Sequence, residues 1–325
     1  MQKYIIAGGV LIIGVAMIVI VFANDLFTVA PAFEELTDEF SATVMQADKI
    51  TTAKGDIVAL EAVEVEFGEV IVPTLAGAMG MDAASFTAFV GEEYTAVATG
   101  VAALPQVTEQ FNGVMELMSS QLDNFEQADA IPTSDLPATT LPWIIVLIGI
   151  SAIIVGIVLF FSFRLGAILA IVLGVVVVAS SVLLNLVDKA GAADDMNEAF
   201  KPAYTQELVT GSEEALVVVG AMGQQMSSEM LPALAQQLGM SEEELGQFMA
   251  ANFPATAQAM QEFEPTMERF TVMVVTFDSQ LENYNTIKDT VLQPIAWAVL
   301  IGGALILILG AWGFIASVKD ETAAA

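Results

Sequence analysis

The sequence predicts an all-α integral membrane protein with four transmembrane helices and two extracytoplasmic helical bundles, built as a tandem parallel duplication. Three observations predict this fold class. The 325 residues are 56% hydrophobic with a mean hydropathy of +0.70, and yet they carry a formal net charge of −30. Apolar and charged residues occupy different segments of the chain. A single offset of 159 residues aligns much of the first half with the second. A chain this apolar is not a typical soluble globule, and one this charged does not lie wholly in lipid.

Four apolar runs without a charged residue are long enough to cross a bilayer. At a rise of 1.5 Å per residue, about 20 residues span a hydrocarbon core about 30 Å thick. The runs are 4–23, 141–161, 165–187 and 294–318. We therefore expect transmembrane helices at 1–23, 141–162, 167–187 and 294–318, with an intervening turn at 163–166 and a tail at 319–325. The first helix is expected to be an uncleaved signal anchor, because its apolar run is long for a signal peptide.

The acidic residues lie between these runs, in the stretches 24–140 and 188–293, which hold all but two of the 39 Asp and Glu residues. Lys3, Arg164 and Lys319 flank the other ends of the apolar runs. The bias of positive charge toward the cytoplasm then places both termini inside the cell and both acidic stretches outside. We expect a multi-pass protein of the plasma membrane.

The repeat is clearest where Ser120-Gln121-Leu122-Asp123-Asn124-Phe125 returns as Ser279-Gln280-Leu281-Glu282-Asn283-Tyr284. Residues 70–127 align with 229–286 without a gap, and 14 of the 58 pairs are identical. Such a run of matches at one offset indicates two copies of one unit, each a span, an outer domain and a span. Because each unit crosses the membrane twice, the copies are parallel.

Each acidic stretch is expected to form a separate helical domain. In the first, turn signals at Gly55, Gly80 and Pro105 separate helices at 31–53, 56–79, 82–103 and 105–127, with Asp82 as an N-cap. In the second, Gly211, Gly239 and Pro265 repeat this punctuation, and Ser241 to Glu244 form a capping box. Four such helices predict an up-and-down bundle in each copy.

Two sets of repeated residues are the candidate functional positions. Glycines seven residues apart on one helix face favour close packing of membrane helices, either with the other half of the chain or with a second protomer. They are Gly149 and Gly156, and in the second copy Gly303 and Gly310. The polar positions Gln121, Asn124, Gln280 and Asn283 are expected to tie the last helix of each bundle to its neighbours.

The chemistry of the chain argues against catalysis. With no Cys and no His, it lacks thiol nucleophiles, imidazole bases and the usual zinc ligands. We expect no catalytic residues, no metal site and no cofactor. Met222, Met226 and Met230 share one helix face, but the residues 159 positions earlier are Val63, Phe67 and Ile71, which favours core packing over copper binding. The carboxylates are interpreted as a solvated face, and nucleic acid is excluded as a partner by charge.

The resulting hypothesis is a non-enzymatic scaffold or accessory subunit whose outer bundles bind other membrane or extracytoplasmic proteins, with membrane lipids and a second copy as further partners. A pore or carrier for apolar, lipid-like ligands is the alternative, and an extracytoplasmic sensor is a third. In topology the arrangement resembles the prominin and tweety group, which implies a membrane-organising role. Those families have an additional span and disulfide-bonded outer domains, whereas this chain has no Cys.

Overall fold

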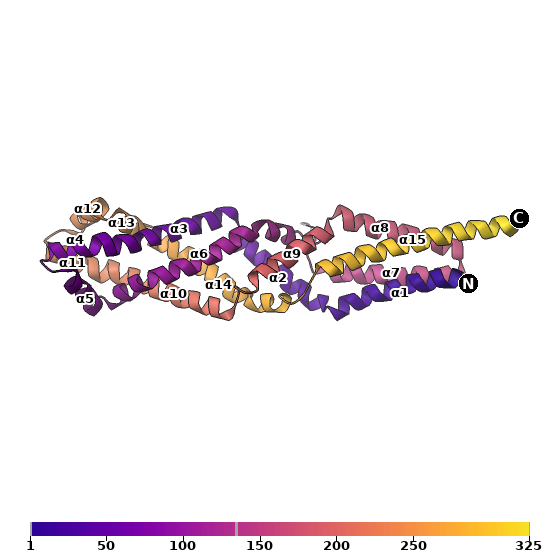
Figure 1. The fold of residues 1–325 in the computed structure, drawn as a ribbon, viewed down its shortest axis with the longest axis horizontal. Coiled ribbons are helices and arrows are strands. Elements are labelled where there is room, and N and C mark those ends of the chain that lie inside the picture. Colours follow the sequence, from indigo (N-terminus) through magenta and orange to yellow (C-terminus); the bar gives the residue numbers. More distant parts are fainter. Residues whose placement is uncertain (1, 134–135, 325) are drawn as a thin grey trace. The chain divides into compact units, whose positions relative to one another are not determined.

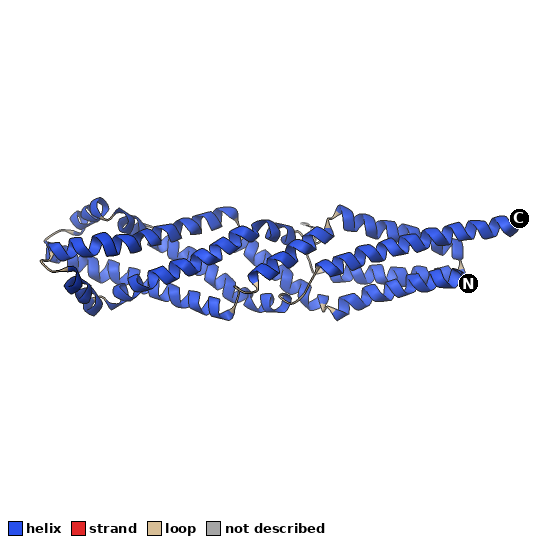
Figure 2. Ribbon diagram, in the orientation of Figure 1, coloured by secondary structure: helices blue, strands red, loops and turns tan. Residues whose placement is uncertain are grey.

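The computed structural model describes residues 2–133 and 136–324, and its regular elements within these ranges are helices (Figure 2). The chain divides into two compact units. Unit 1 comprises Met1–Glu39, Asp123–Lys201 and Glu282–Ala325, and unit 2 comprises Phe40–Leu122 and Pro202–Leu281. The predicted helical class is confirmed, as are four helices that are long and apolar enough to cross a membrane.

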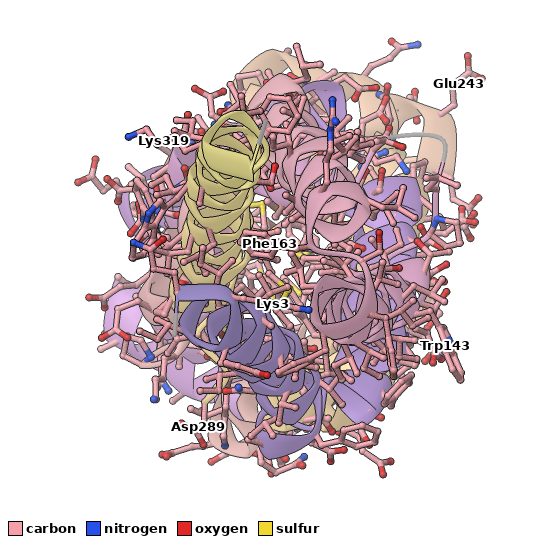
Figure 3. The ribbon with its side chains drawn as sticks, turned by 90° about the vertical axis from the view of Figure 1, so that its right-hand side faces the viewer. Lys3, Trp143, Phe163, Glu243, Asp289 and Lys319 are labelled. Atoms are coloured by element: carbon pink, nitrogen blue, oxygen red, sulfur yellow. The ribbon has the colours of Figure 1, made fainter. Side chains whose placement is uncertain are left out.

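Unit 1 contains these four apolar helices, which lie side by side (Figure 1). They are α1 (Gln2–Ala23), α7 (Thr140–Phe161), α8 (Phe163–Leu183) and α15 (Gln293–Ala324). Helix α1 packs chiefly on α7 and α8 on α15, while contacts of α7 with α8 and of α1 with α15 close the group. Figure 3 looks on to the end of unit 1 at which Lys3, Phe163 and Lys319 lie. The positive residues used for the orientation therefore gather at one end of the four helices.

The four helices are apolar on their outer as well as their inner faces. Ile6, Leu159 and Ile306 are fully buried in the core of this group. On the outside, Ile12 is 71% exposed and Leu147 and Ile308 are also exposed. A helix group that is apolar all round suits a lipid surrounding better than water, so the structure suggests membrane insertion and lipid contact.

Residues with left-handed backbone follow α1 and α8. Asp25 has a φ of 48° and Asn185 a φ of 52°, a conformation that Asn and Asp tolerate better than most residues. The chain then re-enters helices at α2 (Leu26–Thr43) and α9 (Leu186–Phe200). The third apolar helix therefore ends at Leu183, four residues before the predicted end at 187, because Asn185 interrupts the helix.

Unit 2 is built from both acidic stretches. The first supplies α3 (Ala47–Glu66), α4 (Val72–Ala78), α5 (Ala83–Glu93) and most of α6 (Thr95–Asp129). The second supplies α10 (Gln206–Gln225), α11 (Leu231–Leu238), α12 (Glu242–Asn252), α13 (Pro254–Gln261) and most of α14 (Phe263–Ile287). One core joins them, with Phe67 and Phe86 packed among the same residues as Met226, Leu245 and Phe253.

This shared core corrects the expectation of two separate helical domains at 24–140 and 188–293. The physical reason lies in the length of the elements. Helices α5 and α12 have 11 residues each, and helices this short are stabilised by burying an apolar face rather than by their own hydrogen bonds. In unit 2 each stretch buries its apolar faces against the other.

The predicted caps are confirmed, whereas three predicted breaks are wrong. The Ser85 amide donates to Asp82 Oδ1 at 2.7 Å, the Ser241 capping box is formed, and Gly80 and Gly239 have φ near +69° and +68°. Gly55 and Gly211, however, lie inside α3 and α10, and the chain breaks instead just before Ala47 and just before Gln206. Pro105 lies inside α6, and the break falls at Tyr94. Single Gly and Pro residues weaken a helix locally, but packing along its length outweighs that cost here.

Two short π-helical segments, Phe67–Ile71 and Met226–Met230, interrupt the long helices of unit 2. Each is followed by a proline in the first turn of the next helix, Pro73 in α4 and Pro232 in α11. A proline lacks the amide hydrogen that would bond four residues back, and its ring crowds that carbonyl. The wider π turn accommodates this loss. The two segments begin 159 residues apart, like the repeats in the sequence.

Candidate functional site

The four predicted glycines lie at close helix contacts within unit 1. A Cβ added to Gly149 of α7 would lie 2.7 Å from Ile18 Cγ1 and 2.8 Å from the carbonyl oxygen of Gly14, both in α1. A Cβ on Gly156 would lie 2.6 Å from Leu11 Cγ, also in α1. At such distances only a residue without a side chain fits.

The glycines of the second copy face α8 in the same way. A Cβ on Gly303 would lie 2.6 Å from Val177 Cγ1, and one on Gly310 would lie 2.7 Å from the backbone nitrogen of Ile171. Each glycine therefore packs against the apolar helix from its own half of the sequence. The contacts of these four glycines are made within each half of the chain, and not with the other half as the sequence allowed.

The predicted polar positions divide between the two units. Gln121 and Gln280 belong to unit 2, and Asn124 and Asn283 to unit 1. Gln280 is buried, with 5% of its surface exposed, whereas the other three are half-buried. The structure does not bring all four into one site of a single unit.

Unit 2 instead contains a reciprocal pair of helix caps that the sequence did not predict. The Glu66 carboxylate accepts hydrogen bonds from the amides of Ala255 and Thr256 at 3.2 and 2.7 Å, at the start of α13. The Gln225 side-chain oxygen accepts from the amides of Ala96 and Val97 at 2.8 and 3.2 Å, at the start of α6. Each first-turn amide would otherwise be unsatisfied.

The caps are related by the same offset as the sequence repeat. Glu66 and Gln225 are 159 residues apart, and so are the amides that they bind. Each half thus caps a helix of the other half. Phe111 and Phe270, which also correspond, pack against one another with ring centroids 4.8 Å apart and ring planes tilted by 55°. These contacts indicate a local two-fold relation inside unit 2.

One ion pair departs from this two-fold relation. Arg269 Nε donates to Asp56 Oδ2 and Arg269 Nη2 to Asp56 Oδ1, both at 2.7 Å, and Nη2 also donates to Thr266 Oγ1 at 3.0 Å. The hydrogen bonds that Arg269 donates to Asp56 raise the pKa of Arg269 above its usual value. The corresponding residues are Ala215 and Gln110, and Gln110 donates to Ser212 Oγ instead. The two-pronged ion pair joins α3 to α14, and the corresponding helices α10 and α6 have no such pair.

Two neighbouring cavities lie in unit 2 on the side of this ion pair. The first has a volume of about 430 Å³ and is lined by Asp56, Arg269 and Phe270 among others. The second has a volume of about 590 Å³ and is lined mainly by apolar residues, including Val63, Met226 and Met260. Both are lined by Leu60, Ala259 and Phe263, so the two cavities adjoin. Volumes of 300–1,000 Å³ are typical of small-molecule sites.

Thr256, which lines the second cavity, carries a buried hydroxyl group. Its side chain is 1% exposed, and Oγ1 has no hydrogen-bond partner among the described residues. The corresponding residue of the other half is Val97, which is fully buried and has almost the same shape without the hydroxyl. No sequence motif marked Thr256, although the Thr and Val at matching positions of the repeat were a usable signal.

The methionines and the carboxylates have structural surroundings. Met222, Met226 and Met230 are buried, and Met222 lies against Gly100. In the part of the chain that the structure describes, no three His, Cys, Asp or Glu side chains come close enough to hold a metal ion. Glu66, which the sequence grouped with a solvated acidic face, has the capping role described above.

Comparison of the sequence with protein-family models and with curated proteins found no match. The geometry of the two units is therefore the basis for the functional argument.

Proposed function

We propose that this protein is a non-enzymatic scaffold or accessory subunit of the plasma membrane, and that its acidic helical unit binds protein partners in a larger membrane assembly. The observation that carries the proposal is the construction of unit 2. Both acidic stretches share its core, and reciprocal caps and a two-pronged ion pair tie them together. A helical body held in this way presents a fixed surface, which lowers the entropy lost when a partner binds.

The proposal includes a tandem duplication of one ancestral unit. Its support is the recurrence of local geometry at one offset, namely the π-helical segments, the left-handed glycines and the caps from Glu66 and Gln225. A chance resemblance in composition would not place the same irregularities at the same spacing. The two halves then correspond to two subunits that became joined in one chain.

The proposal also places unit 2 outside the cell and both termini in the cytoplasm. Its support is the position of Lys3, Arg164 and Lys319 at the ends of apolar helices, together with the acidity of the intervening stretches. Because the chain has no Cys, a single Cys gives a clean test. We expect Ser120→Cys to react with a membrane-impermeant maleimide in intact cells and the matched Ser162→Cys to react only after lysis. The reverse pattern would invert the topology.

Native mass spectrometry tests the partner proposal. The full chain, purified at native abundance in mild detergent, is expected to retain a second protein at fixed stoichiometry. An unrelated four-span protein, purified in parallel, identifies contaminants. Recovery of the chain only as a free monomer, or only as an oligomer of itself, would contradict a scaffold or accessory role.

The cavities of unit 2 favour a second function, the binding of an apolar, lipid-like ligand. The two adjoining cavities have mainly apolar linings and volumes of about 430 and 590 Å³. Their size and chemistry suit a small apolar molecule, and the four apolar helices of the same chain suggest a protein that contacts lipid. Photoaffinity labelling with a lipid-like probe, followed by mapping of the labelled peptides, tests this function.

A further inference from the structure

We propose that unit 2 binds an uncharged single-chain amphiphile beside Thr256, with the Thr256 hydroxyl hydrogen-bonded to the polar group of the amphiphile and its apolar chain in the adjoining cavities. This proposal rests on the second function above. It adds the class of ligand and the residue that recognises it.

The buried hydroxyl of Thr256 is unfavourable for the fold. A buried hydroxyl without a hydrogen bond lowers the stability of a fold, because the group gives up its hydrogen bonds to water and gains none in return. The start of α13 does not need this group, because the backbone amide of Thr256 is already bonded to Glu66 Oε2 at 2.7 Å. The hydroxyl therefore lowers the stability of the fold and makes no hydrogen bond to any described residue.

The corresponding position in the repeat is Val97, which has no hydroxyl group. Val97 has the same setting, since its amide is bonded to Gln225 Oε1 and its side chain is fully buried. A valine fills this position with nearly the same volume as a threonine and without an unpaired polar group. Packing alone thus favours Val, and the hydroxyl of Thr256 is best accounted for by a ligand that it contacts.

The surroundings of Thr256 set the apolar part of the ligand. The cavity that Thr256 lines is flanked by Met222, Met226 and Met260, whose flexible thioether side chains adapt to ligands of varied shape. Leu60 and Phe263 line both this cavity and its neighbour. A linear chain that passes these two residues would occupy both cavities.

The charges set the polar part of the ligand. The described residues that line the cavity of Thr256 include no Lys or Arg, so an anionic head group would have no counter-charge in a protein of net charge −30. The carboxylate of Glu66 is already used by two amides, and Glu264 is exposed to solvent, where attraction for a cation is weak. An uncharged hydroxyl or carbonyl group is the remaining partner for Thr256.

The test uses the full chain in phosphatidylcholine nanodiscs and a hexadecanol probe that carries a photoreactive diazirine. We expect labelling of peptides from α10, α13 or the start of α14 in the wild type. Removal of one hydrogen bond should weaken binding about 5- to 10-fold in Thr256→Val, whereas Thr256→Ser should retain it. A hexadecane probe, which lacks the hydroxyl, should bind the wild type and Thr256→Val equally.

Thr37→Val is the matched control, because Thr37 is also buried but lies in unit 1, and its hydroxyl donates to the Glu34 carbonyl at 3.1 Å. Thr37→Val should leave hexadecanol binding unchanged. Without ligand, Thr256→Val should unfold at the same temperature as the wild type or at a higher one.

Three results would overturn the proposal. A clear loss of stability in ligand-free Thr256→Val would show that the hydroxyl serves the fold. Equal binding of hexadecanol by the wild type and Thr256→Val would remove Thr256 from the site while the second function stands. The absence of any labelling in unit 2 would overturn both the proposal and the second function.

Discussion

Asp56 and Arg269 form the contact of unit 2 that local sequence patterns were least able to reveal. Asp56 was expected to begin a helix after Gly55, and it lies instead within α3, opposite Arg269 of α14. The pairing links residues 213 positions apart, and helical periodicity carries no information about such a distance. The one sequence signal for this contact was that Arg269 is the single arginine within the two acidic stretches.

Replacement of Arg269 by Lys tests the weight of this contact. A lysine keeps the charge but cannot form both parallel hydrogen bonds to Asp56 or the bond to Thr266. Since the pair is partly exposed, we expect the free energy of unfolding to fall by about 1–2 kcal/mol, between the values for surface and buried pairs. The measurement is thermal unfolding followed by circular dichroism. Lys201→Ala, which removes the exposed pair with Asp289, is the control and should cause no measurable change.

Asp129 in unit 1 makes stability depend on pH. Burial, and to a lesser degree the charge of Asp38, raise the pKa of Asp129 above 3.8, against the opposing effect of Thr37. The folded state then holds its proton more tightly than the unfolded state, so stability falls as pH rises from about 3.8 through the raised folded pKa. Asp129→Asn should therefore raise the unfolding temperature at pH 7 and give no gain at pH 3. The exposed Asp123→Asn on the same helix should show no such difference, and equal behaviour of both variants would contradict the assignment.

Helix ends and helix contacts were predictable to different degrees. Asp82, Gly80, Gly239 and the Ser241 box were recognisable because a cap is decided by a few adjacent residues. Gly55 and Pro105 were misleading because the continuation of a helix is decided by what packs along it. The π-helical segments had a local signal in Pro73 and Pro232, but a proline in a first turn is common without one.

The glycine contacts of unit 1 lead to a prediction at the level of helix pairs. Gly149→Ala would press a methyl group against the backbone of α1, with Gly14 O at 2.8 Å. We expect a loss of about 1–3 kcal/mol, typical of overpacking, and a lower unfolding temperature in nanodiscs. Gly8→Ala in α1 is the matched control, because an added Cβ there would have no neighbour within 4 Å. A loss of the same size in both variants would show that a general effect of the substitution, not the close contact of Gly149 with α1, is responsible.

At the scale of the whole chain, the repeat indicated two copies but not how the copies pack. The same apolar periodicity is expected whether each copy forms a bundle of its own or both copies share one core. The short helices α5 and α12 are the elements that distinguish the two cases, since both bury their apolar residues in one core built from both stretches. Sequence therefore predicted the helices and the apolar spans well, the unit boundaries poorly, and the cavities not at all.

A chain divided in the turn between α7 and α8 tests the shared core. Co-expressed segments 1–162 and 163–325 should co-purify in equal amounts through a tag on one of them, because unit 2 needs residues from both. Met226→Asp, which places a charge in that core, should lower recovery of the pair, while the contacts of α7 with α8 and of α1 with α15 in unit 1 remain. The nearby Ser228→Asp at an exposed position should not. Segments that accumulate alone with native helicity and fail to co-purify would contradict a single core.

The core that Phe86 and Phe253 share also determines the order of events during synthesis. Residues from the first acidic stretch leave the ribosome 159 positions ahead of their counterparts, a delay of about 10 to 30 s at 5–20 residues per second. During that interval the apolar residues of the first stretch lack the residues of the second stretch against which they pack in the folded protein. The 20 carboxylates of the first stretch then act before folding is complete, since like-charged nascent chains repel one another and aggregate less readily. The acidity of the first stretch thus counters aggregation until the second stretch has been synthesised and the core can form.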